Sequence, residues 1–194
     1  MSNDKPLTWQ KSLEYSIDQN QESPHRRFAQ LATVTKKREP QNRTVVIRGI
    51  SHEDHSLLFC TDQRSPKVSA FFESNLAQLC WYFTDTREQY RFSGTVQMIS
   101  DQEARSSMWA TLSSETRAQF YWPAPYGSPT QYLQEEPPTG SRLEELIACN
   151  TPAPYFLLCK LNVNQVDYLK LRPSPRRLIF RNHDRGWQSE EVNP

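Results

Sequence analysis

The sequence predicts a mainly β fold, an antiparallel barrel with a few peripheral helices. Strand-like segments dominate the chain, and they do not alternate with helices in the βαβ order that parallel sheets require. The cleanest of them covers 88–99, where apolar and polar residues alternate. Tyr90 and Phe92 fall on one face of this segment, and Gln89 and Arg91 fall on the other. Such alternation is typical of a strand with one face in the core and one polar face.

The N-terminal half is expected to begin with a short helix over 8–19, because the apolar residues Trp9, Leu13 and Tyr15 recur there. A second helix is predicted over 66–75, directly after a strand. Strands are predicted where β-branched, aromatic and aliphatic residues concentrate between polar turns. These segments are 28–35, 43–50, 56–61, 76–84 and 88–99.

In the C-terminal half, helices are predicted at 101–112, 114–121 and 142–149. A Pro- and Gly-rich loop over 123–140 is long for a compact domain and is therefore a candidate functional segment. Three more strands are expected at 155–170, 176–182 and 186–191. Because no internal repeat or domain-sized linker interrupts the pattern, we expect a single domain over 1–194, with a helical and loop insertion at about 101–150.

Composition argues against several classes of function. A net charge of +1, from 23 basic and 22 acidic residues, gives no global field that would attract nucleic acid or a membrane surface. The basic cluster between Lys170 and Arg185 is accompanied by no recognised nucleic-acid-binding motif. No Gly-rich nucleotide loop is found, and no apolar run approaches the roughly 18 residues of a membrane span. The N-terminus has no signal-peptide pattern. We therefore expect a cytoplasmic protein that binds neither nucleic acid nor membranes.

Histidines and cysteines give little sign of a metal site or a disulfide framework. His52 and His55 stand in a polar stretch between two strands, so a solvated hairpin tip is favoured over a metal site, and no metal is expected. The four cysteines form no C-x-x-C pair, although spacing alone leaves distant disulfides open. In a cytoplasmic chain they are best interpreted as buried, reduced thiols.

The most informative stretch for function joins Arg43-Thr-Val-Val-Ile-Arg48 to a helix start at Ser65-Pro-Lys67. Ser65 suits an N-cap and proline suits the first helical position. A helix N-terminus attracts anions, so with Arg43, Arg48 and Lys67 it would form a cradle for a doubly charged phosphate. The alternative is an ordinary capped helix beside a half-buried strand with solvated arginines. Because Arg43 and Arg48 are five apart, a regular strand would place them on opposite faces, so the cradle requires a bulge or backbone contacts.

Four short motifs follow one another in this part of the chain. They are Arg43-Thr-Val-Val-Ile-Arg48, Phe59-Cys-Thr-Asp62, Ser65-Pro-Lys67 and Glu88-Gln-Tyr-Arg-Phe-Ser-Gly94. Their order and spacing resemble those of the pyridoxamine 5′-phosphate oxidase family, which has R-x-V-L-L-K, F-Y-T-N, S-R-K and R-Q-V-R-V-E-G. The match runs from about Phe28 to Gly94, continues more loosely from Pro154, and is poor over 101–150. This resemblance implies an FMN-binding split β-barrel of Greek-key type, usually a homodimer with flavin at the subunit interface.

The resemblance also implies which residues contact FMN. Arg43 and Lys67 would hold the phosphate beside Ser65, and Arg48 stands where the family has a lysine. A guanidinium there keeps the charge but is a planar fork and not a point charge. The backbone of the segment Val45, Val46 and Ile47 would lie against the flavin ring.

Further implied flavin ligands come from other parts of the chain. Cys60 and Thr61 match the family's Tyr-Thr pair, whose threonine lies on the phosphate side. Gln89 matches a glutamine whose amide can donate and accept at the pyrimidine edge of the flavin. Arg91 shares the polar face of Gln89, and an ordinary solvated arginine is the alternative. Arg177 matches the family's final flavin-binding arginine.

The substrate motifs of the family are missing. Leu169 replaces a flavin-facing tryptophan, and the stretch Pro173–Pro175 stands where the family has a substrate-binding arginine and histidine. The Tyr, Arg and Ser that bind substrate phosphate do not recur around Met108–Ser113, and Tyr126–Ser128 is only a guess for a Gln-Ser flavin contact.

These departures set the functional expectation. The resemblance implies an FMN-dependent oxidoreductase that acts on a different substrate. No motif identifies a catalytic residue. Two alternatives stay open: a non-catalytic flavin-binding protein for storage or sensing, and a true pyridoxamine 5′-phosphate oxidase with a rebuilt substrate site.

Overall fold

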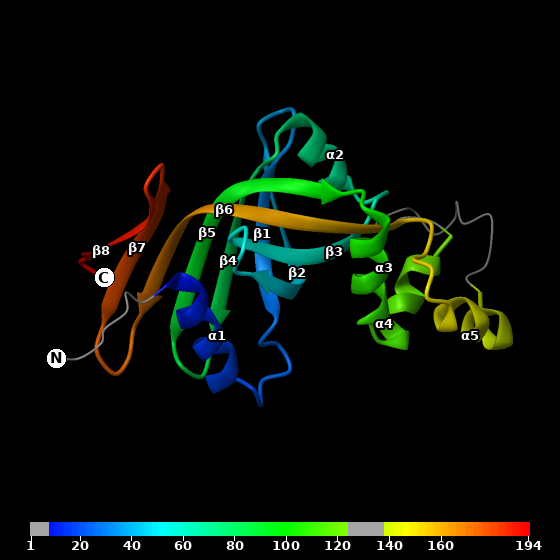
Figure 1. Cartoon of the computed structure of the whole chain (residues 1–194), viewed down its shortest axis with the longest axis horizontal. Helices are drawn as coiled ribbons and strands as arrows, with labels where there is room; N and C mark the ends of the chain where they lie inside the picture. Colours follow the sequence, from blue (N-terminus) through cyan, green and yellow to red (C-terminus); the bar gives the residue numbers. More distant parts are fainter. Residues whose placement is uncertain (1–7, 124–137) are drawn as a thin grey trace.

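The computed structural model describes residues 8–123 and 138–194. Within them, eight strands form one antiparallel sheet in the order β3-β2-β1-β4-β5-β6-β7-β8, and β3 also pairs with β6. This extra pairing closes the first six strands into a barrel, and β7 and β8 extend from it as a hairpin (Figure 1). The predicted mainly β, antiparallel split-barrel class is confirmed.

The elements lie close to their predicted positions. The strands are β1 (Phe28–Val34), β2 (Pro40–Ser51), β3 (Ser56–Asp62), β4 (Leu76–Phe83), β5 (Glu88–Ile99), β6 (Phe156–Lys170), β7 (Arg176–His183) and β8 (Gly186–Val192). The helices are α1 (Trp9–Gln19), α2 (Pro66–Glu73), α3 (Gln102–Ala110), α4 (Ser114–Ala118), the 3₁₀ turn η1 (Gln119–Tyr121) and α5 (Gly140–Ala148). Most of the predicted 123–140 loop, including Tyr126–Ser128, lies outside the described residues.

Helix α1 packs against the barrel through a different stripe than the one predicted. Trp9, Leu13 and Ile17 are buried, whereas Tyr15 is 60% exposed. The reason is helical spacing: residues four apart share a face, and Tyr15 lies only two positions after Leu13. A hydrogen bond of 2.8 Å between the hydroxyls of Ser16 and Tyr90 ties the same face to β5.

The helices α3, α4 and α5 gather at the end of the molecule opposite the β7–β8 hairpin (Figure 1). Their apolar contact with β6 is built on Trp109, whose ring meets Phe120 and Phe156 edge to face. Arg117 holds this group together, because its guanidinium donates to the carbonyl oxygens of three residues. Those residues are Trp109, Ala110 and Ile147.

The cysteines differ from the expectation that all would be buried. Cys159 is buried and Cys60 and Cys80 are half-buried, but Cys149 is exposed. Cys149 follows α5, a helix with no buried residue, so it never reaches the core. All four thiols are free.

The pairing of β5 with β6 is interrupted by a register shift between Ser93 and Gly94. A Cβ atom on Gly94 would lie 2.0 Å from the backbone oxygen of Asn162, which is far inside contact distance. Only glycine therefore lets these two long strands approach and bend around the barrel.

We expect Gly94→Ala to lower the free energy of unfolding by about 3 kcal/mol, because the backbone must move to relieve the overlap. Gly49→Ala is the matched control, since its Cβ would meet only the Leu58 side chain at 3.1 Å, which can shift. Urea unfolding measures the free energy of unfolding of both variants. Equal stability of the two variants would contradict the proposed close approach.

Candidate functional site

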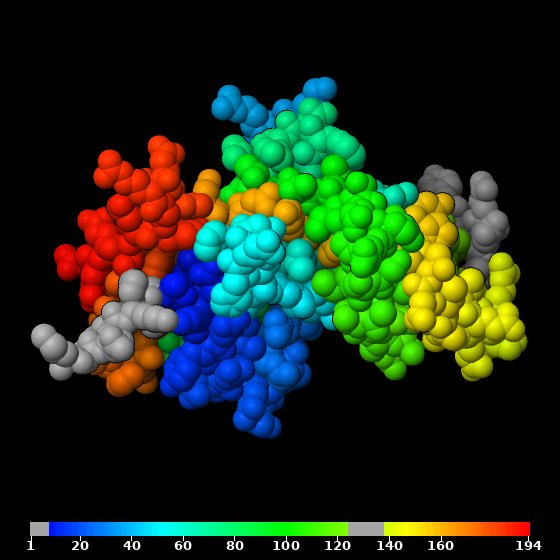
Figure 2. All heavy atoms as spheres, viewed as in Figure 1, coloured from blue at the N-terminus to red at the C-terminus, as the bar shows by residue number. Residues whose placement is uncertain are grey.

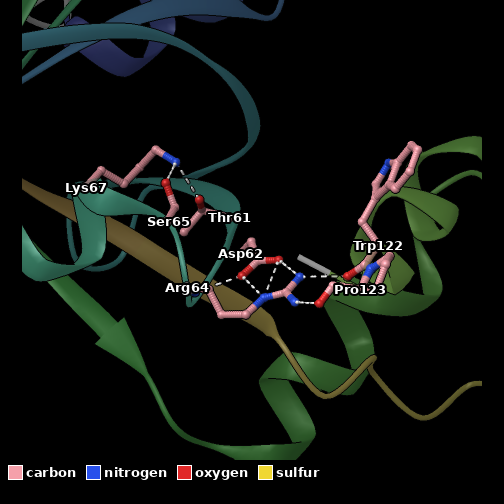
Figure 3. Close-up of polar contacts among 7 residues, drawn as sticks. All are labelled: Thr61, Asp62, Arg64, Ser65, Lys67, Trp122 and Pro123. Atoms are coloured by element: carbon pink, nitrogen blue, oxygen red, sulfur yellow. Dashed lines mark hydrogen bonds and ion pairs between the residues drawn. The ribbon is translucent and has the colours of Figure 1, made fainter. Parts of the chain in front are cut away.

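The turn from β3 into α2 gathers three polar groups at one end of the barrel. The Lys67 Nζ donates to the hydroxyl of Thr61 at 2.8 Å and to that of Ser65 at 2.6 Å (Figure 3). Ser65 is the N-cap residue and Pro66 begins the helix, as the sequence predicts. The Ser65 hydroxyl makes no cap hydrogen bond, because it faces the Lys67 ammonium instead. The first N–H groups of α2 thus lack the serine cap that usually occupies them.

Electrostatics at this turn favours an anion. Burial and then the neighbouring charge of Arg43 lower the pKa of Lys67 below its ordinary value. Among the described residues, Arg43, Arg48 and Lys67 are paired with no carboxylate within 4.0 Å, although most other basic residues near the sheet are. A doubly negative group would offset the repulsion between the cations and the cost of burying Lys67.

A cavity of about 260 Å³ opens beside Lys67. Its lining combines predicted flavin ligands with residues of the helical insertion: Thr44, Val45, Val46, Arg48, Cys60, Thr61, Asp62, Ser65, Lys67, Thr116, Gln119 and Phe120. The structure therefore brings together seven of the predicted residues in one place. The side chains of Val45 and Ile47 point into the barrel core, so this part of β2 offers the cavity backbone and the outward Val46.

The two arginines of β2 lie on different faces. A register shift between Ile47 and Gly49 places Arg48 on a bulge at the cavity wall. Arg43 stays on the inward face, where its guanidinium donates to the Leu31 carbonyl at 3.1 Å and the Thr33 hydroxyl at 2.7 Å. Arg43 is not among the lining residues of the cavity, although its charge acts on Lys67. A direct contact of Arg43 with a ligand phosphate stays a prediction.

The remaining predicted ligands form a second group on the outer face of the sheet. Gln89 and Arg91 lie on β5, and Arg177 lies on β7. Asp167 on β6 connects two of them, because Arg177 donates to its carboxylate at 3.0 and 2.9 Å and Arg91 donates to it as well. Burial alone would raise the pKa of Asp167, but these hydrogen bonds outweigh it and keep the pKa below its ordinary value.

The predicted ligands at the Lys67 cavity and those on β5 and β7 do not meet within one chain. Thr44 at the cavity lies in one row with Gln30, Cys80 and Arg91, across β2, β1, β4 and β5. Three strand spacings separate the ends of this row, a distance of about 14 Å. A ligand that touches both Lys67 and Gln89 therefore requires either a long reach or a second copy of the chain.

Sequence reasoning missed the residues that the insertion contributes. Thr116, Gln119 and Phe120 come from α4 and η1, and no motif in that stretch singles them out. An ion pair between Arg64 and Asp62 holds the insertion in place, since Arg64 also donates to the carbonyls of Trp122 and Pro123 (Figure 3).

Comparison with known proteins identifies the class to which this fold and site belong. Residues 6–100 match the family model for the pyridoxamine 5′-phosphate oxidase FMN-binding domain. The chain is 33% identical over 198 residues to pyridoxine/pyridoxamine 5′-phosphate oxidase 2 of Arabidopsis thaliana, with 96% of each chain covered. A pyridoxamine 5′-phosphate oxidase-related, FMN-binding protein of Nostoc punctiforme has a similar structure, with a TM-score of 0.83, 36% identity and coverage of 98% and 99%.

A further solved structure, PhzG of Burkholderia lata, shares the fold with a TM-score of 0.78 at 18% identity, over 99% of this chain and 95% of PhzG. The chain belongs to the pyridoxamine 5′-phosphate oxidase family of FMN-binding proteins. The expected FMN cofactor is thereby confirmed. Among the described residues, no helix combines the length and apolar character that crossing a membrane requires.

Proposed function

We propose that this protein is an FMN-dependent oxidoreductase with an altered substrate site. The observation that carries the proposal is the convergence of Arg48, Ser65 and Lys67 on one cavity at a helix start. A terminal phosphate dianion fits this arrangement, because it would accept from the ammonium, the guanidinium and the first N–H groups of α2.

The cavity fits the phosphate end of FMN in size as well as charge. A volume of about 260 Å³ is smaller than the usual 300–1,000 Å³ of small-molecule sites, so this cavity suits the phosphate end rather than a whole flavin. Bound FMN supplies hydride-transfer chemistry, and the protein supplies binding and orientation. Lys67 and Arg48 would fix the phosphate, and the backbone around Val46 would position the adjoining part of the molecule.

The carboxylate and the thiol among the described lining residues of the cavity are poorly suited to proton transfer or nucleophilic attack. Asp62 is the carboxylate among its lining residues, and both of its oxygens already accept from Arg64. Burial raises the pKa of the Cys60 thiol to about 12, so the thiol stays protonated at neutral pH. These two observations support a role for the described residues in holding the cofactor rather than in transferring protons.

We also propose that the site is completed by a second copy of the chain in a homodimer. In a two-fold dimer each patch meets its complement on the partner, so the Gln89 and Arg177 group of one subunit can face the Lys67 cavity of the other. Aromatic side chains support this arrangement: Phe28 and Tyr82, exposed by 39% and 40%, lie on β1 and β4 between the two groups. Covering them would remove apolar surface from water.

Light scattering should therefore give about twice the chain mass of 22.7 kDa. Tyr82→Glu should weaken dimerisation and FMN binding together, because it places a charge in the apolar part of the interface. Tyr15→Glu is the matched control, since Tyr15 is exposed on α1, away from this face. A monomer that binds FMN as tightly as the dimer would contradict a shared site.

Catalysis separates the main proposal from the non-catalytic alternative. The FMN-loaded protein is mixed without oxygen with NADPH, NADH or a small reductant, and the flavin absorbance is followed. An oxidoreductase should be reduced and, when an electron acceptor is added, reoxidised through repeated cycles. Flavin that no reductant bleaches, or that never turns over, would support storage or sensing.

The similarity to the Arabidopsis pyridoxine/pyridoxamine 5′-phosphate oxidase 2 favours a second candidate, a true oxidase of pyridoxamine 5′-phosphate. The absence of the family's substrate motifs from 108–113 and 173–175 argues against it. Formation of pyridoxal 5′-phosphate by the FMN-loaded protein distinguishes this candidate from the main proposal.

A further inference from the structure

An acidic side chain stands at the proposed phosphate cavity, where a further negative charge is unfavourable. Asp62 is the one carboxylate among the described lining residues of the Lys67 cavity, and it is only 8% exposed. Its charge acts on the ammonium: burial, the largest influence, lowers the pKa of Lys67, whereas Asp62 acts in the opposite direction. A phosphate dianion bound by Lys67 would therefore be repelled by Asp62, unless the charge of that carboxylate is neutralised.

Arg64 neutralises this carboxylate through a two-point ion pair. Its Nε donates to Oδ1 of Asp62 at 3.0 Å, and its Nη2 donates to Oδ2 at 2.6 Å (Figure 3). The backbone N–H of Arg64 also donates to Oδ1, at 2.7 Å. Only 16% of the Arg64 side chain and 7% of the Asp62 side chain are exposed, so solvent and salt screen the pair weakly. Because Arg64 is not among the described lining residues of the cavity, it would act on a ligand through Asp62.

The helical insertion holds the Arg64 guanidinium in this position. Nη1 donates to the carbonyl oxygen of Pro123 at 3.1 Å, and Nη2 donates to that of Trp122 at 3.0 Å (Figure 3). The guanidinium also lies over the Tyr155 ring, 3.7 Å from its centroid. Trp122 directly follows η1, which contributes to the cavity lining. One side chain thus joins the β3–α2 turn to the part of the cavity wall that the insertion supplies.

The insertion is a substantial body for one side chain to hold. Figure 2 shows the atoms of α3 and α4 (green) and of α5 (yellow) gathered in one block at this end of the molecule. The same guanidinium therefore serves two purposes, because it binds the carboxylate at the cavity and the carbonyls at the end of η1. Neutralisation of Asp62 and docking of the insertion depend on one residue.

We propose that Arg64 is a positioning residue for the phosphate of FMN, which neutralises Asp62 at the cavity and keeps the insertion against the β3–α2 turn. The inference rests on the proposed FMN site at Lys67. With the ion pair intact, the phosphate meets the full positive charge of Arg48 and Lys67. Removing Arg64 alone would leave a buried carboxylate unpaired beside the phosphate, whereas removing both charges of the pair would not.

A double-mutant cycle tests the role of Arg64. Affinity for FMN is measured by quenching of flavin fluorescence in the wild-type protein, in Arg64→Ala, in Asp62→Asn and in the double variant. Arg64→Ala should bind FMN at least about tenfold more weakly, because the charge of Asp62 then opposes the phosphate. Adding Asp62→Asn should restore most of the lost affinity. Asp62→Asn alone should bind FMN no more weakly than wild type.

Riboflavin, which lacks the phosphate, separates this electrostatic role from a general loss of structure. Arg64→Ala should lower the affinity for riboflavin much less than the affinity for FMN. Lys160→Ala is the matched control, since it breaks an ion pair of 2.7 Å with Asp54, before the opposite end of β3 and outside the described cavity lining. It should leave the affinity for FMN unchanged.

Three results would overturn the proposal. They are equal affinity for FMN in Arg64→Ala and wild type, equal losses for FMN and riboflavin, and no recovery when Asp62→Asn is added. A wild-type protein that binds no FMN would refute the proposed cofactor site itself, so the two failures are distinguishable. If Arg64→Ala does not fold, Asp62→Asn decides the question, because weaker binding of FMN than in wild type would contradict repulsion by Asp62.

Discussion

Replacing both cavity cations, in the double variant Arg48→Ala and Lys67→Ala, should weaken FMN binding by at least about a hundredfold. Each charge-assisted contact with phosphate is worth about 1.5–3 kcal/mol, which is roughly ten- to a hundredfold in affinity. Both side chains line the cavity and neither is neutralised by a carboxylate within the described residues. Quenching of flavin fluorescence on titration with apoprotein gives the dissociation constants.

Three further variants separate phosphate binding from general effects. Lys67→Arg keeps the charge and should lose much less affinity than Lys67→Ala. Arg185→Ala removes an exposed charge at the far hairpin and should leave affinity unchanged. The loss of FMN affinity in Arg43→Ala should lie between those of Lys67→Ala and Arg185→Ala. The Arg43 guanidinium is held by Leu31 and Thr33 and acts on the cavity through its charge. A double variant that holds FMN as tightly as wild type would show that the phosphate is bound elsewhere.

The second large effect concerns the substrate. We expect the FMN-loaded protein to oxidise pyridoxamine 5′-phosphate at least about a thousandfold less efficiently than an authentic oxidase assayed in parallel, because several charge-assisted contacts with substrate phosphate are missing. Arg117 does not replace them, since its guanidinium is committed to three backbone carbonyls of the insertion. Formation of pyridoxal 5′-phosphate, measured as kcat/KM, decides the matter.

An efficiency close to that of the authentic oxidase would contradict the altered substrate site. The similarity to the Arabidopsis oxidase would then extend to activity, and the polar residues Thr116 and Gln119 at the cavity would become the first candidates for substrate binding. Failure of this prediction would leave the FMN site itself untouched, because the two rest on different residues.

Local signals predicted the turn from β3 into α2 well. The order Ser65, Pro66, Lys67 after a strand specifies a helix start by cap chemistry alone, and the structure has it at the predicted residues. Strict alternation likewise placed Arg43 and Arg48 on opposite faces, and Arg48 lines the cavity with Thr44 and Val46, which share its face.

Contacts between distant segments were beyond local reasoning. The Arg91, Asp167 and Arg177 cluster depends on how β5, β6 and β7 are paired, because its three members come from three different strands. The contribution of Gln119 depends on how α4 and η1 fold back over β3, for which the stretch contains no periodic pattern. The tip at 52–54 is exposed, as predicted, whereas His55 is half-buried because its ring contacts Gln10 of α1, beside a turn that looks polar in sequence.

We propose that the cavity beside Lys67 holds the phosphate of FMN. The most direct test is to purify the protein, release its cofactor by heat and identify the cofactor by chromatography. The released cofactor is expected to be FMN, bound in about one copy per chain after reconstitution. FAD as the cofactor, or no bound flavin even after reconstitution with FMN, would contradict it.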